Sequence, residues 1–453
     1  MGQKHHFKIG QSFLIEKPKN AETYLQVARD TEKYIATKKI ETEDGIYWQN
    51  SGTEHTDLTF YSGSAGVLYF YIKLYQVAKD EYYYSQIEKG ERYLAKHWRD
   101  LLAGPPSLPL PGTQEGLHFG LGGVSIVLCE SYQLTKSEAA KKAIHEIGQF
   151  YIEKAKRDER GVYWSGSTGL AMDGGIILTL LEQDRALQEE EIRALILEAA
   201  ESYLIRGKKK ESGSIEYNGF ENILPVSLPN YEFGTSGSGY LLTLLYQLTK
   251  DKRYLEAAEG CAKYIQEIQI RQEKGYLVPH DIYGPKEEPP VFYLSSCHGP
   301  AGTAKLFYQL YQLTGEQKWL DEIGLLVDGM ESLGAPEKQS AGLWNNVCFC
   351  CGQAGQVQFF LGLYLKTKEK RYLDLARRAA AVLLGEREEN RLEGLVYWDM
   401  AWERIKPEVI TKPIGYYDGA AGVAAVLLQM YLLEKGEFYW NRLLDDPFPE
   451  KQE

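Results

Sequence analysis

Residues 63–80 read GSAGVLYFYIKLYQVAKD, a glycine-rich turn followed by a helix-length stretch that is apolar nearly all round. Such a stretch is typical of a helix that is buried on every side. The pattern recurs at intervals of roughly 50 to 70 residues, so the chain is built from internal repeats. The six later turns read Gly120-Leu121-Gly122-Gly123, Met172-Asp173-Gly174-Gly175, Ser236-Gly237-Ser238-Gly239, Gly299-Pro300-Ala301-Gly302, Gly352-Gln353-Ala354-Gly355 and Gly419-Ala420-Ala421-Gly422.

A second kind of helix follows the apolar one. Residues 256–269 read EAAEGCAKYIQEIQ, and residues 374–386 read DLARRAAAVLLGE. Both place apolar residues at positions i, i+3, i+4 and i+7 with charged residues between them, which indicates a surface helix with one buried stripe. Each repeat therefore consists of an inner helix and an outer helix.

The two ends of the chain predict that the repeats close into a ring. An outer-type helix over residues 21–40 precedes the first turn, and the last repeat ends on an inner-type helix. These two helices can complete one unit, whereas an open array needs polar capping repeats. We expect an all-α protein, an α/α toroid of seven inner and seven outer helices. It would form one domain over residues 1–453, with an N-terminal tail at 1–20. The turns would gather at one end of the inner ring.

Composition excludes several classes of protein. The 453 residues include 51 basic and 63 acidic side chains, a net charge of −12, which argues against a nucleic-acid partner. There is no apolar run of the roughly 20 residues that span a bilayer, and the N-terminus lacks the apolar core of a signal peptide. We expect a cytoplasmic protein that is not integral to a membrane. Six cysteines are too few for a disulfide scaffold.

Four of the six cysteines lie in or beside two neighbouring turns. The fifth turn contains Cys297, and the sixth contains Cys348, Cys350 and Cys351. Adjacent turns of a ring are neighbours in space, so Cys297, Cys350 and Cys351 can converge. Three thiolates and one open position suit a catalytic Zn²⁺, and thiolates disfavour magnesium or calcium. The alternative is that these thiols are small buried hydrophobes. Cys348 is either a packing residue or an alternative ligand, and the helical cysteines, Cys129 and Cys261, are expected in the core.

Seven glycine-rich repeats, with Cys-His-Gly in the fifth turn and Cys-Cys-Gly in the sixth, resemble the lanthionine synthetase C-like family of lanthipeptide cyclases. The resemblance implies an α/α toroid and a zinc ion held by Cys297, Cys350 and Cys351. It also implies a reaction, the Michael addition of a peptide cysteine to dehydroalanine or dehydrobutyrine, which forms a thioether ring. The implied partners are a dehydrated precursor peptide and a lanthipeptide dehydratase.

This reaction needs a proton donor for the enolate that the addition creates. His298, next to Cys297, is the first candidate, and His118, before the second turn, is the weaker one. Asp173 lies in the third turn, near the place of a carboxylate of the family. The histidine that the family often has before the fourth-turn glycine is absent, because Phe233 stands there.

Two rival readings remain. One is a zinc-containing protein of the same fold that binds a thiol peptide or glutathione without forming rings. The other is an α/α-barrel glycoside hydrolase, which needs two carboxylates across the scissile bond. The proline-rich residues 274–294 predict a loop before the fifth turn, suited to peptide recognition or simply a surface insertion. The carboxylates near the expected mouth of the ring are Asp57, Asp173, Glu232, Asp399 and Asp418.

Overall fold

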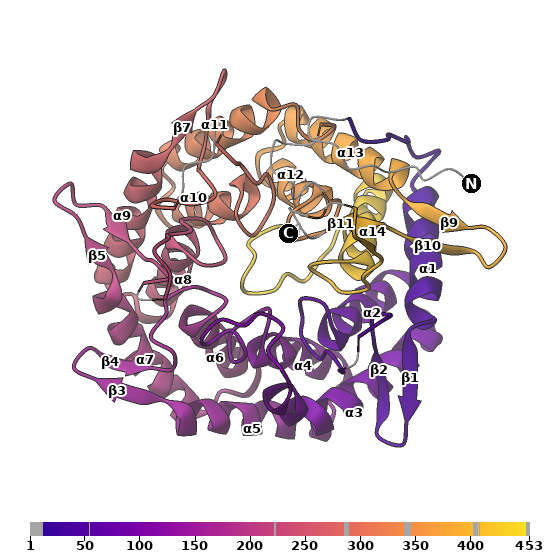
Figure 1. Ribbon diagram of the computed structural model, residues 1–453, viewed down its shortest axis with the longest axis horizontal. Coiled ribbons are helices and arrows are strands. Elements are labelled where there is room, and N and C mark those ends of the chain that lie inside the picture. Colours follow the sequence, from indigo (N-terminus) through magenta and orange to yellow (C-terminus); the bar gives the residue numbers. More distant parts are fainter. Residues whose placement is uncertain are drawn as a thin grey trace.

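The computed structural model describes residues 12–53, 55–221, 223–284, 290–338, 346–401, 406 and 408–449. These residues form fourteen helices arranged as two concentric rings (Figure 1). The inner ring consists of α2 (Ser64–Ala78), α4 (Leu121–Thr135), α6 (Asp173–Leu187), α8 (Thr235–Thr249), α10 (Pro300–Thr314), α12 (Gln353–Thr367) and α14 (Ala420–Lys435). The outer ring consists of α1 (Glu22–Ala36), α3 (Glu81–Ala103), α5 (Glu138–Lys154), α7 (Glu190–Arg206), α9 (Lys252–Ile268), α11 (Lys318–Ser332) and α13 (Lys370–Gly385).

The ring closes as the sequence predicted. The last inner helix, α14, packs against both the first inner helix, α2, and the first outer helix, α1. The first and last helices of the chain thus complete one unit between them. The α/α toroid with seven inner and seven outer helices is confirmed, and Cys129 and Cys261 are fully buried in its core.

The glycines that begin the inner helices are needed for close approach. Gly352, which caps α12, has an extended backbone with φ −121°, and a Cβ atom there would overlap the backbone oxygen of Asn346. The fourth repeat corrects the expected register. Helix α8 begins at Thr235 with Gly234 as its N-cap, so the motif there starts at Gly234 and not at Ser236. Every inner helix ends at a residue in the left-handed region, a common helix C-terminus.

Short antiparallel hairpins, which the sequence did not predict, decorate the ring (Figure 1). Their strands contain two to four residues, too few for an alternating pattern to stand out. None of the helices in the described part of the chain is long and apolar enough to cross a membrane. The pairs are β1 (Lys39–Thr42) with β2 (Gly45–Trp48), β3 (Lys156–Asp158) with β4 (Gly161–Tyr163), β5 (Lys208–Lys209) with β6 (Ile215–Glu216), β7 (Ile270–Arg271) with β8 (Tyr276–Leu277), β9 (Glu388–Asn390) with β10 (Leu395–Tyr397), and β11 (Met400–Ala401) with β12 (Ile410–Thr411).

Residues 437–449, called the C-terminal segment below, turn back from α14 into the space inside the inner ring (Figure 1). Lys73 of α2 donates to the backbone oxygen of Asn441 at 2.7 Å, and Lys305 of α10 pairs with Asp446 at 2.9 Å. The ring of Phe448 packs on Tyr308, 4.7 Å between centroids. The C-terminal segment therefore lies inside the toroid and contacts its inner helices.

The first described residues of the chain lie against the outer ring. The backbone amides of Phe13 and Glu16 donate to the oxygens of Glu337 and Ala381. The expected tail over residues 1–20 lies partly outside the described residues, and the single-domain organisation over 1–453 stays a prediction.

Candidate metal centre

Backbone hydrogen bonds join the seven glycine-rich turns into a closed circle. The backbone amide of Cys297 donates to the backbone oxygen of Cys350 at 3.2 Å. The amide of Cys350 donates to the backbone oxygen of Tyr417 at 2.9 Å. Tyr417 in turn donates to Tyr61 of the first turn at 3.0 Å, so the last turn is bonded to the first. The remaining links are Tyr61 to His118, Leu117 to Leu170, Ala171 to Glu232, and Glu232 to Cys297.

This circle brings one position of the repeat together from all seven units. The position lies two residues before the N-cap of each inner helix, and it carries most of the chemistry-bearing side chains of the site. Its occupants are Tyr61, His118, Leu170, Glu232, Cys297, Cys350 and Tyr417. Aligning the turns on their helix starts would have placed Glu232 and Tyr417 beside the cysteines.

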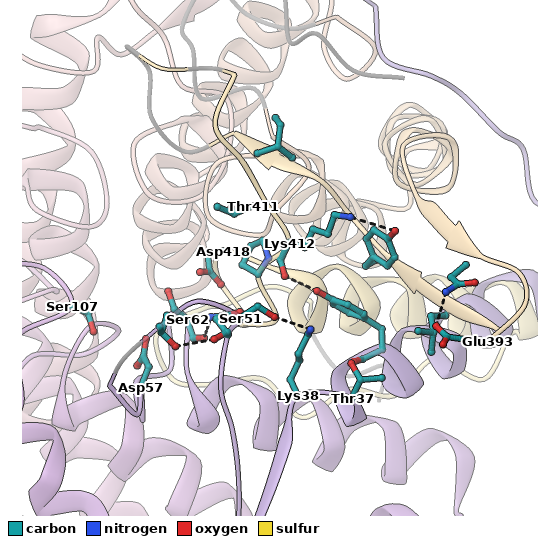
Figure 2. Close-up of a pocket in the computed structure, with 18 residues that line it drawn as sticks. Thr37, Lys38, Ser51, Asp57, Ser62, Ser107, Glu393, Thr411, Lys412 and Asp418 are labelled. Carbon is teal, nitrogen blue, oxygen red and sulfur yellow. Dashed lines mark hydrogen bonds between the residues drawn. The ribbon is translucent and has the colours of Figure 1, made fainter. Parts of the chain in front are cut away.

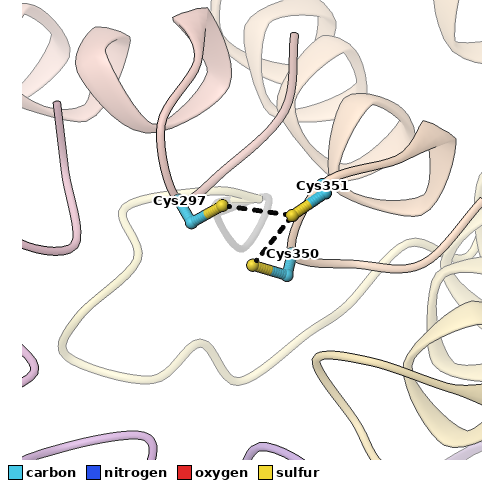
Figure 3. A group of neighbouring side chains, drawn as sticks. All are labelled: Cys297, Cys350 and Cys351. Atoms are coloured by element: carbon cyan, nitrogen blue, oxygen red, sulfur yellow. Dashed lines mark hydrogen bonds between the residues drawn. The ribbon is translucent and has the colours of Figure 1, made fainter. Parts of the chain in front are cut away.

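The three predicted cysteine ligands converge. Cys297 comes from the turn before α10, and Cys350 and Cys351 come from the turn before α12 (Figure 3). The sulfur of Cys351 lies 3.3 Å from that of Cys297 and 3.4 Å from that of Cys350, and all three lie within 4.8 Å of one another. All are buried and free of disulfides.

The donor set fits a zinc ion. Four sulfurs at about 2.3 Å from a tetrahedral Zn²⁺ would lie about 3.8 Å from each other, within the range that this cluster spans. Burial by itself would raise the pKa of the Cys350 thiol, but hydrogen bonds from Cys297, Cys351 and Tyr61 and the charge of His118 hold that pKa well below its usual value. Cys350 therefore favours the thiolate, the form that binds metal. Burial and the neighbouring sulfurs raise the pKa of Cys297 and Cys351 well above the usual value, so these two thiols keep their protons until a cation joins the cluster.

Cys348 lies beside the cluster without joining it. Its sulfur accepts a hydrogen bond from the backbone amide of Cys351 at 3.4 Å. The metal-ligand group found among the described residues contains only the other three cysteines. This contact makes Cys348 a support of the turn that carries Cys350 and Cys351.

His118 lies at the centre of a buried network. Its Nδ1 is 2.9 Å from a carboxylate oxygen of Glu232, and its Nε2 is 3.0 Å from Asp445 and 2.8 Å from the hydroxyl of Tyr417. Carboxylates only accept, so both ring nitrogens donate when both bonds are made. Burial would lower the pKa of His118, but Glu232 and Asp445 raise it to about 9. The imidazole is therefore charged at neutral pH.

His298 is partly buried next to Cys297, in a largely aromatic environment. Its ring stacks on Phe233, 5.6 Å between centroids, and meets the ring of His280 edge-on at 4.9 Å. Its Nδ1 has no hydrogen-bond partner among the described residues. Burial and the nearby His280 hold the pKa of His298 well below its usual value, so this ring is neutral.

Asp173 faces the loop that follows β4. Its carboxylate accepts hydrogen bonds from the backbone amides of Trp164, Ser165 and Gly166 at 2.8 to 3.0 Å. Both oxygens are thus engaged in holding that loop against the start of α6.

Two of the carboxylates near the mouth of the ring line one cavity. Asp57 and Asp418 lie with Ser62 on the wall of a cavity of about 970 Å³ beside the first and seventh turns (Figure 2). Burial, with the charge of Asp57, raises the pKa of Asp418 to about 8, although a hydrogen bond from Ser62 opposes the shift. Burial raises the pKa of Asp57 as well, so both carboxyls of this pair hold their protons more strongly than an exposed carboxyl does.

The predicted loop over residues 274–294 contains β8, and its residues 285–289 lie outside the described part. His280, in this loop, packs against Tyr293 with 4.4 Å between centroids and against His298. The loop thus reaches the fifth turn, where Cys297 lies.

A family profile and one solved structure support the fold. The sequence profile of the family described as "Lanthionine synthetase C-like protein" matches residues 54–444. Among solved structures, nisin cyclase is 14% identical over 88% of this chain and 93% of its own, with a TM-score of 0.61. A cellobiose 2-epimerase from Spirochaeta thermophila (15% identity, 76% of this chain, 96% of that chain) has a TM-score of 0.46. A family 76 glycoside hydrolase from Bacteroides thetaiotaomicron (13%, 92% and 78%) has one of 0.45.

Proposed function

Because this chain belongs to the lanthionine synthetase C-like family, we propose that it is a zinc-dependent lanthipeptide cyclase. It would join a cysteine thiol of a peptide to a dehydroalanine or dehydrobutyrine of the same peptide, which forms lanthionine or methyllanthionine. The observation that carries the proposal is the cluster of three buried thiols from two neighbouring turns, Cys297, Cys350 and Cys351. Its partner would be a precursor peptide that a lanthipeptide dehydratase has modified, in the cytoplasm.

The three cysteines would hold the zinc and leave its fourth position to the substrate. When bound, the ion would lower the pKa of the substrate thiol, whose ordinary value of roughly 8.5 leaves little thiolate at neutral pH. Cys297 and Cys350 are held in place by the hydrogen bond between their turns, and the amide of Cys351 by the sulfur of Cys348. This support limits reorganisation at the centre.

The addition is balanced without a redox partner. A carbon–sulfur bond forms at the β carbon, the carbon–carbon π electrons move to the adjacent carbonyl, and the α carbon then takes up one proton. The thiol releases one proton, so no atom is gained or lost overall. A general acid near the cluster must supply the proton to the α carbon.

We assign that acid to His118. It is charged at neutral pH, and its charge acts on Cys350. His118 would donate the proton in place of the family's histidine, because this chain has Phe233 at that position. His298 is the second candidate, because its unpartnered Nδ1 lies on the residue after Cys297. We assign Asp173 a supporting role, since its carboxylate is engaged with the backbone of the loop after β4.

Phe233, which stands where the family often has a histidine, favours a second candidate function. Without the expected histidine, the same fold and metal would serve a protein that captures a thiol peptide or glutathione and forms no ring. In that case Cys297, Cys350 and Cys351 keep their role, and His118 serves only the charge balance of the cluster.

The test uses the purified full-length protein and a dehydrated peptide with one cysteine. Elemental analysis should find about one zinc per chain, and mass spectrometry after thiol alkylation should show that the free thiol disappears as the thioether forms. Free thiols that persist in the presence of bound zinc would favour the capture function. Absence of zinc from the purified and from the zinc-reconstituted protein would overturn both.

A further inference from the structure

The C-terminal segment runs through the interior of the toroid towards the circle of turns. Near its start, the hydroxyl of Tyr439 donates to the backbone oxygen of Gln76, close to the end of α2 that is remote from the turns. Further along, the hydroxyl of Tyr240 donates to the oxygen of Leu444 at 2.6 Å. The next residue, Asp445, reaches His118. The segment thus crosses the interior and reaches the site at Asp445.

Asp445 is held there by both its backbone and its side chain. Its backbone oxygen accepts from the hydroxyl of Tyr231 and lies 3.5 Å from Nζ of Lys305. Its carboxylate is 3.0 Å from Nε2 of His118 and 3.2 Å from the hydroxyl of Tyr417. The side chain is 2% exposed.

We propose that Asp445 is a positioning residue of the cyclase, which the C-terminal segment carries to Nε2 of His118 and which fixes the orientation and protonation of that ring. The proposal rests on the function proposed above. It assigns to the end of the chain a part in the active site that the glycine-rich turns do not supply.

The geometry separates this role from simple anchoring. Asp446 pairs with Lys305 at 2.9 Å and accepts from Gln358 at 2.9 Å, and Phe448 packs on Tyr308. These contacts hold the segment without the carboxylate of Asp445. A buried carboxylate needs a charged partner to offset its desolvation. His118 is the charged group that hydrogen-bonds to the carboxylate of Asp445, and the charge of Lys305 adds to its effect. The other carboxylate oxygen of Asp445 has no hydrogen-bond partner among the described residues.

His118 faces groups from four parts of the chain. Glu232, before α8, lies at Nδ1, and Asp445 and Tyr417 lie at Nε2. The charge of the His118 ring lowers the pKa of Cys350, before α12. Asp445 and the hydroxyl of Tyr417 both lie at Nε2, whereas Glu232 lies at Nδ1. Replacing Asp445 therefore removes a carboxylate acceptor from Nε2 and leaves the hydrogen bond of Nδ1 to Glu232 in place.

The test compares Asp445→Asn with Asp446→Asn in the full-length zinc-loaded protein. Asp446 is a matched control because it lies in the same segment, is also buried, and contacts Lys305 and not His118. Thioether formation on a dehydrated peptide is measured from pH 6 to pH 9.5 together with zinc content. His118 is followed by NMR of histidine-labelled protein, with its signals assigned by their loss in His118→Gln.

We expect Asp445→Asn to lower kcat about 10- to 100-fold at pH 8 and less at pH 6, with KM within about twofold and zinc unchanged. The reason is that the ring loses one of the two carboxylates that keep it protonated. Asp445→Glu should restore the wild-type pH profile. Asp446→Asn should not share this pattern: its rate should change by the same factor at every pH.

Two outcomes would overturn the proposal. One is a pH profile of Asp445→Asn that runs parallel to that of the wild type. The other is an unchanged titration of the His118 signals in that variant. If the wild type itself forms no thioether, the proposed function fails, while the NMR titration still decides whether Asp445 governs the state of His118.

Discussion

The three cysteines of the cluster bond mainly to one another, whereas His118 has a carboxylate on each ring nitrogen. Both groups lie on the same circle of turns, and both are buried. The His118 network pairs a cation with anions that the chain itself provides. The cysteine cluster gathers groups that become anions on losing their protons, with no cationic side chain in contact among the described residues.

The charges of the His118 network are balanced by the protein itself, whereas those of the cysteine cluster need a bound cation. Buried anions without a partner are costly, so the cysteine cluster is stable as thiolates only when a cation joins it. The His118 network needs no addition. Changes in the first should therefore alter metal content, and changes in the second should alter activity while the metal stays.

The largest effect is expected from the cysteines. Cys297→Ala or Cys350→Ala should reduce zinc from about one per chain to near zero and lower thioether formation by more than about 100-fold, since even changes behind a ligand cost 10- to 100-fold. Elemental analysis and mass spectrometry measure both. Cys261→Ala, in the core, is the control and should keep its zinc. Full zinc retention in both ligand variants would remove the site.

The next effect is expected from His118. His118→Asn should keep zinc within error and lower the rate of thioether formation about 10²- to 10⁴-fold, the usual contribution of a general acid. Steady-state rates with zinc analysis measure it. His145→Asn, which changes a half-exposed histidine paired with Glu189, is the control. An unchanged rate would move the proton transfer away from His118.

The stability of the protein should also depend on pH through His118. Its pKa is about 9 in the folded state, above an ordinary value near 6.5. The stabilisation is complete below pH 6.5 and is lost as pH rises through about 9; it amounts to a few kcal/mol. Urea unfolding at pH 6.5 and 9.5 should show that the difference in unfolding free energy between the wild type and His118→Asn shrinks at the higher pH. A constant difference would contradict this.

The smallest effect is expected from Cys348. Cys348→Ala removes only the sulfur that accepts from the amide of Cys351, so zinc should stay and stability should fall by about 1 kcal/mol. Thermal denaturation and elemental analysis check this. Loss of zinc in Cys348→Ala would instead place this residue among the ligands and enlarge the cysteine cluster to four.

The ring and the cluster could be predicted because both follow from local repetition. The alternation of inner-type and outer-type helices is visible in short windows, and neighbouring turns bring Cys297 to Cys350 and Cys351 whatever the details of packing. The predicted start of the fourth motif, Ser236, is wrong by two residues, since Gly234 caps the helix. The fourth turn contains glycines at 234, 237 and 239, and the local sequence does not indicate which of them is the cap.

The His118 network could be predicted only in part. His118 is separated by 114 residues from Glu232 and by 327 from Asp445. Glu232 shares its place in the repeat with His118, so aligning the turns would have found it. Asp445 follows the last helix and belongs to no repeat. Its place depends on how a non-repeating segment folds into the interior, and no periodic signal records that.

The circle of backbone hydrogen bonds has a consequence for how the site opens. A row of paired amides usually frays from its ends, but a closed row has no end, so opening one link leaves its neighbours bonded on the far side. The amides of Tyr61, Glu232, Cys297, Cys350 and Tyr417 should therefore exchange with solvent deuterium slowly and as one group. A metal that links the fifth turn to the sixth would slow the exchange of all of them, including those on the opposite side of the ring.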